Sequence, residues 1–312
     1  MSKGVHPQIQ AVLETMQAQA LPNPAECTVA QARELAELAG ARRQEAFGPI
    51  ELARVEDLAS PGGIPVRIYR PLVGQVLPVL VYYHGGGHVI CSLETHDLIC
   101  RNLAQLTECA VVSVDYAMGP EHPFPAAVDT SYAATRWISQ SAEELGFDPT
   151  RLAVGGDSAG GNLAAVVALM ARDLAEFGVS AQVLVYPVID YRGGTASYSA
   201  FGTGYGILEE RTVAWFADHY FADPGDMEDW RAAPHLAERH TGLPPTFVLT
   251  AECDVLHDEG AAYAQQLRKA GVSVDYETYP GMIHAFFGFL GLVDDTQRAH
   301  RRVAAFLKDV WR

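Results

Sequence analysis

Three short segments of the chain carry residues that together could perform nucleophilic acyl transfer. The first is Gly156-Asp157-Ser158-Ala159-Gly160, which follows the apolar run Leu152–Val154 and precedes an alanine-rich stretch. A G-x-S-x-G sequence at a strand-to-helix junction is typical of a nucleophile elbow, in which the serine is exposed on a strained turn. For this segment alone, a glycine-rich turn that packs a helix tightly against a sheet is the alternative.

The second segment is His84-Gly85-Gly86-Gly87, directly after the apolar run Val79–Tyr83. Consecutive glycines leave backbone N–H groups unshielded and able to point at one spot, as an oxyanion hole requires. A zinc site is the rival interpretation, because His88 and His96 follow closely. However, glycines rather than a helical turn separate His84 from His88, and no carboxylate arrangement of the metalloprotease kind accompanies them. We therefore expect no metal.

The third segment contains a general base, His284, after the strand-like run Val274–Tyr279. Asp254 similarly follows the run Thr246–Ala251. Groups that follow strands lie at the carboxyl edge of a doubly wound sheet, and the chain order serine, acid, histidine is that of an α/β-hydrolase architecture. Asp258 would instead lie in the first turn of the next helix, where a carboxylate favourably meets the helix N-terminus. Asp254 is therefore the expected acid.

The elements that must position these residues alternate along the chain. Strands are expected near residues 78–83, 110–114, 152–156, 181–186, 246–251 and 273–279. Helices are expected near residues 94–108, 125–140, 158–175, 257–271 and 294–311. Two amphipathic helices (7–19 and 28–46) and two strands (51–58 and 64–69) precede them. This order predicts an α/β fold, with a mostly parallel, doubly wound sheet and helices on both faces.

The stretch Asp190–Ala233 interrupts this alternation, because it is rich in glycine and aromatic residues and too long for an ordinary connection. We expect it to form a helical cap with residues 1–46, over a catalytic core of residues 47–189 and 234–312, within a single unit of residues 1–312. Alternatively, its aromatic residues only pack the helix Glu209–Phe221 onto the core. The candidate substrate-binding residues are His84, Asp157, Phe201, Tyr205 and Trp215.

Four motifs carry a resemblance to a known family. They are His84-Gly85-Gly86-Gly87, Gly156-Asp157-Ser158-Ala159-Gly160-Gly161, Asp115-Tyr116 with Pro120-Glu121-His122-Pro123-Phe124-Pro125-Ala126, and Asp254-Val255-Leu256 with Asp258-Glu259-Gly260. Together they resemble the hormone-sensitive-lipase branch of the α/β-hydrolases, which includes the bacterial family IV carboxylesterases. The likeness extends from the region of Ile50 to the end of the chain.

The resemblance implies a role for each motif. Ser158 would be the nucleophile, His284 the general base and acid, and Asp254 its orienting carboxylate. The oxyanion would be held by the backbone N–H groups of Gly86, Gly87 and Ala159. The chain departs from the family at Ala117-Met118-Gly119, where Arg-Leu-Ala is usual, at His257, often an arginine, and at Ala285, usually a glycine. None of these departures removes a catalytic group.

The implied activity is that of a serine carboxylesterase, a hydrolase that cleaves short-to-medium acyl esters through an acyl-enzyme and needs no cofactor. An amidase, a lactonase or a deacetylase could use the same triad. Amide hydrolysis asks more of leaving-group protonation, and the sequence shows no extra acid for it. A non-catalytic ligand-binding homologue is disfavoured because all three triad residues are present.

Composition limits the partners and the location. The 312 residues carry a net charge of −16, which disfavours nucleic acid and anionic membranes as partners and leaves a small ester as substrate. No apolar run reaches the length of a membrane span, so no stable membrane anchoring is expected. The segment Met1–Gln10 is polar, unlike a secretory signal. The five cysteines lack metal-type spacing, and free thiols favour a cytoplasmic location. A homodimer could form.

Overall fold

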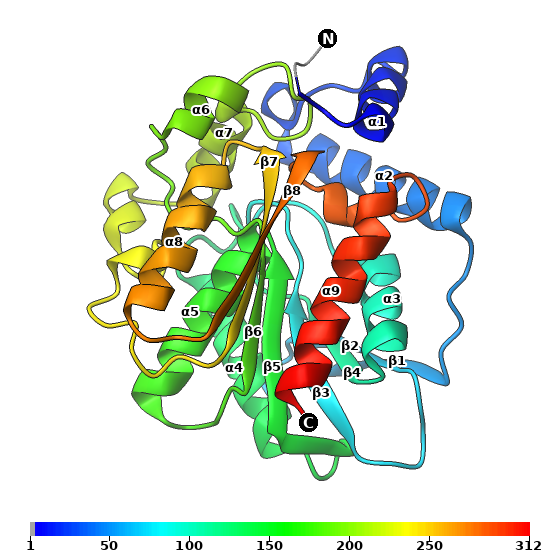
Figure 1. Ribbon diagram of the computed structural model, residues 1–312, viewed down its shortest axis with the longest axis vertical. Helices are drawn as coiled ribbons and strands as arrows, with labels where there is room; N and C mark the ends of the chain where they lie inside the picture. The colour runs from blue at the N-terminus through cyan, green and yellow to red at the C-terminus, as the bar shows by residue number, and fades with distance from the viewer. Residues whose placement is uncertain (1–3) are drawn as a thin grey trace.

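The computed structural model describes residues 4–312, so residues 1–3 of the expected polar N-terminal segment and cap lie outside the described part (Figure 1). A single eight-stranded sheet, ordered β1-β2-β4-β3-β5-β6-β7-β8, runs through these residues. β1 pairs antiparallel with β2 and β2 with β4, whereas all other neighbouring strands are parallel. The predicted mostly parallel α/β sheet is confirmed.

The strands agree with the expected ones except at some ends. They are β1 (Arg54–Ala59), β2 (Pro65–Arg70), β3 (Leu77–Tyr83), β4 (Ala110–Val114), β5 (Phe147–Asp157), β6 (Ala181–Val185), β7 (Thr246–Cys253) and β8 (Val274–Ile283). β8 continues through Pro280 and Gly281, beyond the end that we predicted at Tyr279. Proline is tolerated there because β8 is an edge strand, in which not every N–H group must bond to a neighbour.

The helices also follow the predicted alternation. They are α1 (Pro7–Ala18), α2 (Val29–Phe47), α3 (Asp97–Thr107), α4 (Ala126–Gln140), α5 (Ala159–Leu174), α6 (Ala196–Phe201), α7 (Glu210–Tyr220), α8 (His257–Lys269) and α9 (Asp294–Val310). The start of α2 is fixed by a capping box, in which the Thr28 hydroxyl accepts the Gln31 N–H and the Gln31 side chain accepts the Thr28 N–H. The short helix α6 was not predicted.

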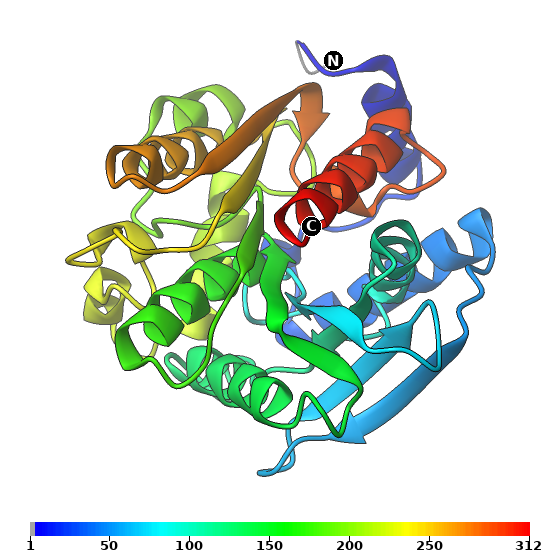
Figure 2. The same ribbon diagram turned by 60° about the horizontal axis from the view of Figure 1, so that its bottom comes forward.

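Both faces of the sheet are covered by helices. In Figures 1 and 2, α3 and α9 lie on one face, and α4, α5 and α8 lie on the other. Within β3, Val79, Val81 and Tyr83 belong to one hydrophobic cluster and Leu80 and Tyr82 to the other. Successive side chains of a strand point to opposite faces, so a strand covered on both sides reads as a continuous apolar run.

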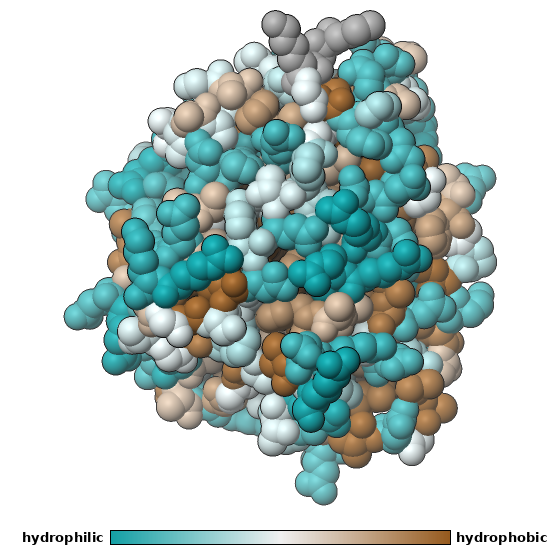
Figure 3. All heavy atoms as spheres, viewed as in Figure 1, coloured by the Kyte–Doolittle hydropathy of each residue, from teal (hydrophilic) through white to brown (hydrophobic). Residues whose placement is uncertain are grey.

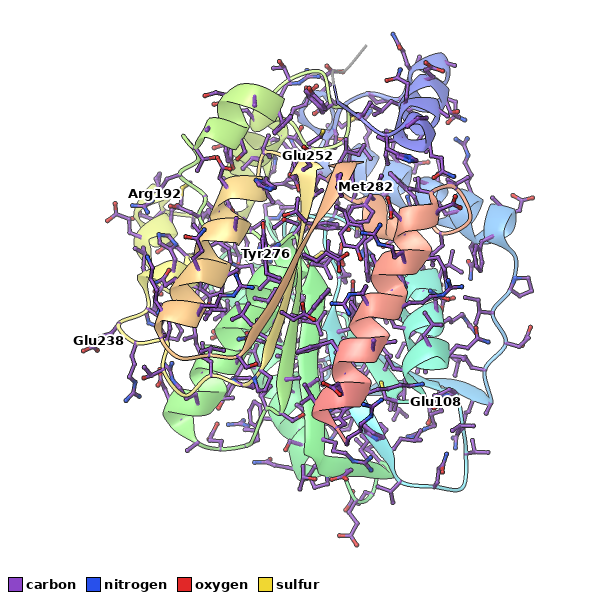
Figure 4. All side chains as sticks on the ribbon, viewed as in Figure 1. Glu108, Arg192, Glu238, Glu252, Tyr276 and Met282 are labelled. Carbon is purple, nitrogen blue, oxygen red and sulfur yellow. The ribbon has the colours of Figure 1, made fainter. Side chains whose placement is uncertain are left out.

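The carboxyl ends of the parallel strands meet below α1, α2, α6 and α7, at the top of Figure 1. Glu252 and Met282, labelled in Figure 4, lie at this end of β7 and β8. The Glu252 carboxylate accepts the N–H of Gly281 at 2.7 Å, and the Gly281 carbonyl accepts the N–H of His6 at 2.9 Å. The segment leading into α1 is therefore tied to the end of β8, three residues before His284.

The surface is predominantly polar on the face drawn in Figure 3, where apolar side chains occur in small groups among hydrophilic ones. Within residues 4–312, no helix combines the length and the apolar character that crossing a membrane requires.

Candidate active site

Ser158 lies on a sharp turn between β5 and α5. Its backbone angles are φ 56° and ψ −119°, a strained conformation for a residue with a side chain. The turn is held from both sides, because the Ser158 N–H donates to the Val185 carbonyl at 2.9 Å and the Ser158 carbonyl accepts the Val188 N–H at 3.1 Å. At Gly160, a Cβ atom would collide with the Tyr83 carbonyl oxygen of β3. Glycine is therefore needed for α5 to approach the sheet closely.

Ser158, His284 and Asp254 are brought together by three different loops. The Ser158 Oγ lies 2.8 Å from Nε2 of His284, and Nδ1 of His284 lies 2.7 Å from Oδ2 of Asp254. All three side chains are buried. Since the carboxylate accepts a hydrogen bond from Nδ1–H, the neutral imidazole presents an unprotonated Nε2 to the serine hydroxyl.

The surroundings fix the acid and the imidazole. The second carboxylate oxygen of Asp254 accepts the Leu256 N–H at 3.0 Å, and the Tyr186 ring lies 4.6 Å from the imidazole, centroid to centroid. Asp258, the other candidate acid, has a different partner from His284: its carboxylate accepts the N–H of Ser197 at 2.8 Å. Ala285 has φ 66°, the left-handed conformation that glycine adopts without strain.

The backbone of the glycine loop faces the same place. Gly86 and Gly87 have φ values of 111° and 61°, and both line the cavity above Ser158. The N–H groups of Gly86, Gly87 and Ala159 donate no hydrogen bond to any residue within 4–312. Three unused donors therefore lie in the glycine loop that lines the cavity and in the residue after Ser158, and an oxyanion hole requires such donors.

Asp157 holds the glycine loop in place. Its carboxylate accepts hydrogen bonds from the Tyr82 hydroxyl at 2.8 Å and from the Gly85 N–H at 3.2 Å, and it lies 3.3 Å from Nε2 of His96. Burial alone would raise the pKa of Asp157, but His96 and the Tyr82 hydroxyl lower it below its ordinary value. An ionised Asp157 therefore anchors the loop from beneath.

A cavity of about 830 Å³ lies over the serine. Ser158, His284 and Asp157 line it from the core, which is the sheet edge where ligands bind in such folds. Its opposite wall comes from α1, α2 and residues 206–216, and includes Val12, Met16, Leu35, Ala39, Ile207 and Phe216. Its volume is in the range of pockets for small molecules, about 300–1,000 Å³.

Four of the predicted substrate-binding residues do not line this cavity, and these predictions are corrected here. His84 is fully buried beneath the loop, stacked on Tyr116 with the rings 4.4 Å apart. Phe201 and Tyr205 pack edge to face at 5.1 Å, against the core cluster on the α9 side of the sheet. Trp215 lies against His219, 4.3 Å away. Asp157 alone of the five lines the cavity.

Residues that we did not predict occupy part of the wall. Phe216, next to Trp215 on α7, lies against the glycine loop, because a Cβ atom at Gly87 would collide with its ring. One residue turns a helix by about 100°, so only the placement of α7 decides which neighbour faces the cavity. Arg43 on α2 also lines the cavity, and no motif in the sequence marks it.

Comparison with known proteins finds the same fold and related sequences. A family described as having an alpha/beta hydrolase fold matches residues 80–288. The carboxylic ester hydrolase LipN of Mycobacterium tuberculosis is 43% identical over 254 residues, which is 78% of this chain and 67% of that protein. The ethyl acetate hydrolase of Pseudomonas putida is 41% identical over 239 residues, 74% of each chain. The solved hyperthermophilic esterase of the archaeon Pyrobaculum calidifontis superposes with a TM-score of 0.95, at 41% identity over 99% of both chains.

Proposed function

The chain belongs to the hormone-sensitive-lipase-like branch of the α/β-hydrolases and is a carboxylic ester hydrolase, and we propose that Ser158, His284 and Asp254 carry out its reaction. The observation that carries the proposal is the pair of hydrogen bonds, 2.8 and 2.7 Å long, that links the three side chains at the floor of the cavity. A nucleophile, a base and an orienting acid in this order generate a reactive alkoxide-like oxygen at neutral pH.

The reaction begins when Nε2 of His284 accepts the Ser158 hydroxyl proton as Oγ attacks the ester carbonyl carbon. Asp254 keeps Nδ1 protonated and stabilises the imidazolium that forms. The N–H groups of Gly86, Gly87 and Ala159 bind the oxyanion. A single such donor is worth roughly 10²–10³ in kcat in a well-studied protease.

The tetrahedral intermediate collapses when the His284 imidazolium donates its proton to the leaving alcohol oxygen. Water then enters and attacks the Ser158 acyl carbonyl while His284 accepts its proton. The second tetrahedral intermediate collapses when His284 donates that proton to Ser158 Oγ, which releases the carboxylic acid. Each proton taken by His284 in one half-reaction is returned in that half-reaction, so the enzyme regains its starting state without a cofactor.

Ser158→Ala tests the assignment. The variant should lose hydrolysis of 4-nitrophenyl butyrate, apart from the residual rate that binding and the oxyanion hole provide. A fluorophosphonate should label the wild type at Ser158, as shown by peptide mass spectrometry, and should leave the variant unlabelled at the active site. Labelling of another serine with loss of activity would reject the assignment.

We propose that the acyl part of the substrate is short to medium in length. The support is the position of α1, α2 and residues 206–216, which wall the cavity opposite Ser158 and act as the proposed cap. Each buried methylene is favourable by about 0.8 kcal/mol while it fits, and costly once it displaces packed side chains. We therefore expect kcat/KM to peak at roughly two to six acyl carbons. Acetate, butyrate, octanoate and palmitate esters of 4-nitrophenol test this, and a maximum at palmitate would contradict it.

Two further expectations concern the protein in the cell. We propose a cytoplasmic location, supported by five free cysteines, since free thiols persist in a reducing compartment. Cell fractionation with detection of the protein tests this proposal. The predicted homodimer remains a prediction, which light scattering coupled to gel filtration would decide.

A further inference from the structure

The cavity contains a cation that the proposed reaction does not use. Arg43, on α2, is half-buried and lines the cavity. Among residues 4–312 its guanidinium has no hydrogen-bond partner and no ion-pair partner. Burial lowers the pKa of Arg43 below its ordinary value, yet an arginine side chain remains protonated. A desolvated charge without a partner is unfavourable, so its presence calls for a ligand of opposite charge.

The carboxylates on the cavity wall are already engaged. Glu26 and Glu209 both pair with Arg211, at 2.6 and 2.8 Å. Asp157 accepts hydrogen bonds from the glycine loop and is not paired with Arg43 at ion-pair distance. Three arginines line the cavity. Arg211 has two carboxylates and the exposed Arg42 donates to Gln19, whereas Arg43 has neither a carboxylate nor a hydrogen-bond partner among residues 4–312.

The guanidinium of Arg43 lies toward the reacting end of the cavity. The groups that act on it electrostatically are Cys91, Tyr186 and Asp157, and all three line the cavity. Asp157 directly precedes Ser158 in the chain, and the Tyr186 ring contacts that of His284. Arg43 thus faces the same space as the serine, not the outer surface of α2.

Resting on the proposed ester hydrolysis, we propose that Arg43 binds a carboxylate carried by the substrate, and that the preferred substrates are esters bearing an anionic group. A guanidinium matches a carboxylate with two parallel, charge-assisted hydrogen bonds. The net charge of −16 repels anions at long range, so the preference must come from this short-range contact within the cavity. The carboxylate can belong to the acyl part, as in a monomethyl ester of a dicarboxylic acid, or to the alcohol part.

Matched pairs of esters test the inference. Monomethyl succinate, glutarate, adipate and suberate are compared with the primary amides of the same half-esters, which have nearly the same shape and no charge. The alcohol side is probed with 4-acetoxybutanoate and 4-acetoxybutanamide. Initial rates are followed in a pH-stat at neutral pH, and the quantity of interest is the ratio of kcat/KM for each anionic ester to that for its amide. The series with the higher ratio identifies which part of the substrate carries the carboxylate.

Three variants separate charge recognition from other effects. Arg43→Gln should lower the ratio for the preferred anionic ester by about ten- to a hundred-fold, the loss expected when hydrogen bonds to a charged group are removed. The kcat/KM for the amide should stay within a few-fold of the wild-type value. Arg43→Lys should retain part of the preference, because the charge remains but the planar fork is lost. Arg54→Gln is the matched control, since Arg54 is an exposed arginine on β1 that pairs with Glu56 and does not line the cavity.

The outcomes are distinct. A wild-type ratio of one or less in every pair, or a ratio that Arg43→Gln leaves unchanged, overturns the inference while ester hydrolysis stands. Failure of the wild type to hydrolyse both the charged and the neutral esters refutes the proposed function, and the inference with it.

Discussion

Replacing Asp254 with asparagine tests how this acid supports the serine and histidine. The carboxylate accepts two hydrogen bonds, from Nδ1 of His284 at 2.7 Å and from the Leu256 N–H at 3.0 Å. Asparagine has one oxygen, so it can accept only one of the two. The Leu256 N–H is a fixed backbone donor, whereas the imidazole can exchange tautomers, and we therefore expect the asparagine oxygen to face Leu256.

In that orientation the amide NH₂ of the variant points at Nδ1 of His284. The imidazole then carries its proton on Nε2, where it cannot accept the Ser158 proton. Amidation of a triad aspartate with intact geometry lowers kcat by about 10⁴ in a well-studied protease. Since a tenfold change in rate is about 1.4 kcal/mol, the barrier to acylation should rise by about 5.5 kcal/mol.

The assay is the kcat for 4-nitrophenyl butyrate, with thermal melts to show that the variants fold. Asp258→Asn is the matched control, four residues away, and its side chain accepts from the Ser197 backbone, a role that the asparagine oxygen can keep. We expect this control to stay within a few-fold of wild type. Asp254→Asn with a tenth or more of the wild-type kcat, or Asp258→Asn with the larger loss, would refute the reasoning.

Three further variants address packing, specificity and pH. Gly160→Ala should lower the melting temperature and the activity together, because its Cβ meets the backbone of β3 and overpacking costs about 1–3 kcal/mol, whereas Gly178→Ala, with open space around its Cβ, should do neither. Phe216→Ala should raise kcat/KM for octanoate relative to butyrate by up to about fourfold per accommodated methylene, and Trp215→Ala should not; an unchanged chain-length profile in Phe216→Ala would remove that ring from the limiting wall. Burial raises the pKa of Glu259 well above its ordinary value, so the folded state retains a proton that the unfolded state has lost, and wild-type stability falls as the pH rises above the ordinary range of a glutamate. The melting-temperature advantage of Glu259→Gln should therefore grow between about pH 5 and 8, and a constant difference would contradict the raised pKa.

Much of the fold and the reacting centre could be predicted from the sequence because the relevant signals are local. The apolar run of β3 is continuous because both faces of that strand are covered, and the glycines around Ser158 are required by close backbone approach within a few residues of the serine. The order of serine, acid and histidine, each after a strand, predicted that they would meet at one edge of a parallel sheet.

The wall of the cavity could not be predicted in the same way. The aromatic and glycine content of residues 201–206 favoured Phe201 and Tyr205 as pocket residues. Both are instead partly buried against the core cluster, in agreement with the alternative interpretation, in which the aromatic residues of this segment serve packing. His84 reads as a site residue because it begins the glycine motif, yet the end of β3 directs its ring beneath the loop. In each case the residue type was compatible with either environment.

The sequence by itself determined the order of the strands and helices, the serine turn and the three groups that meet at the sheet edge, because these depend on residue periodicity and on backbone sterics over a few positions. Only the tertiary structure decided that α7 turns Phe216, and not Trp215, toward the cavity. It also decided that α2 brings Arg43 to the cavity without a counterion. Those facts depend on how helices distant in sequence are rotated and packed against the sheet. A step of one residue turns the side chain by about 100° around the helix axis, and no local pattern in the chain fixes which neighbour on α7 faces the cavity.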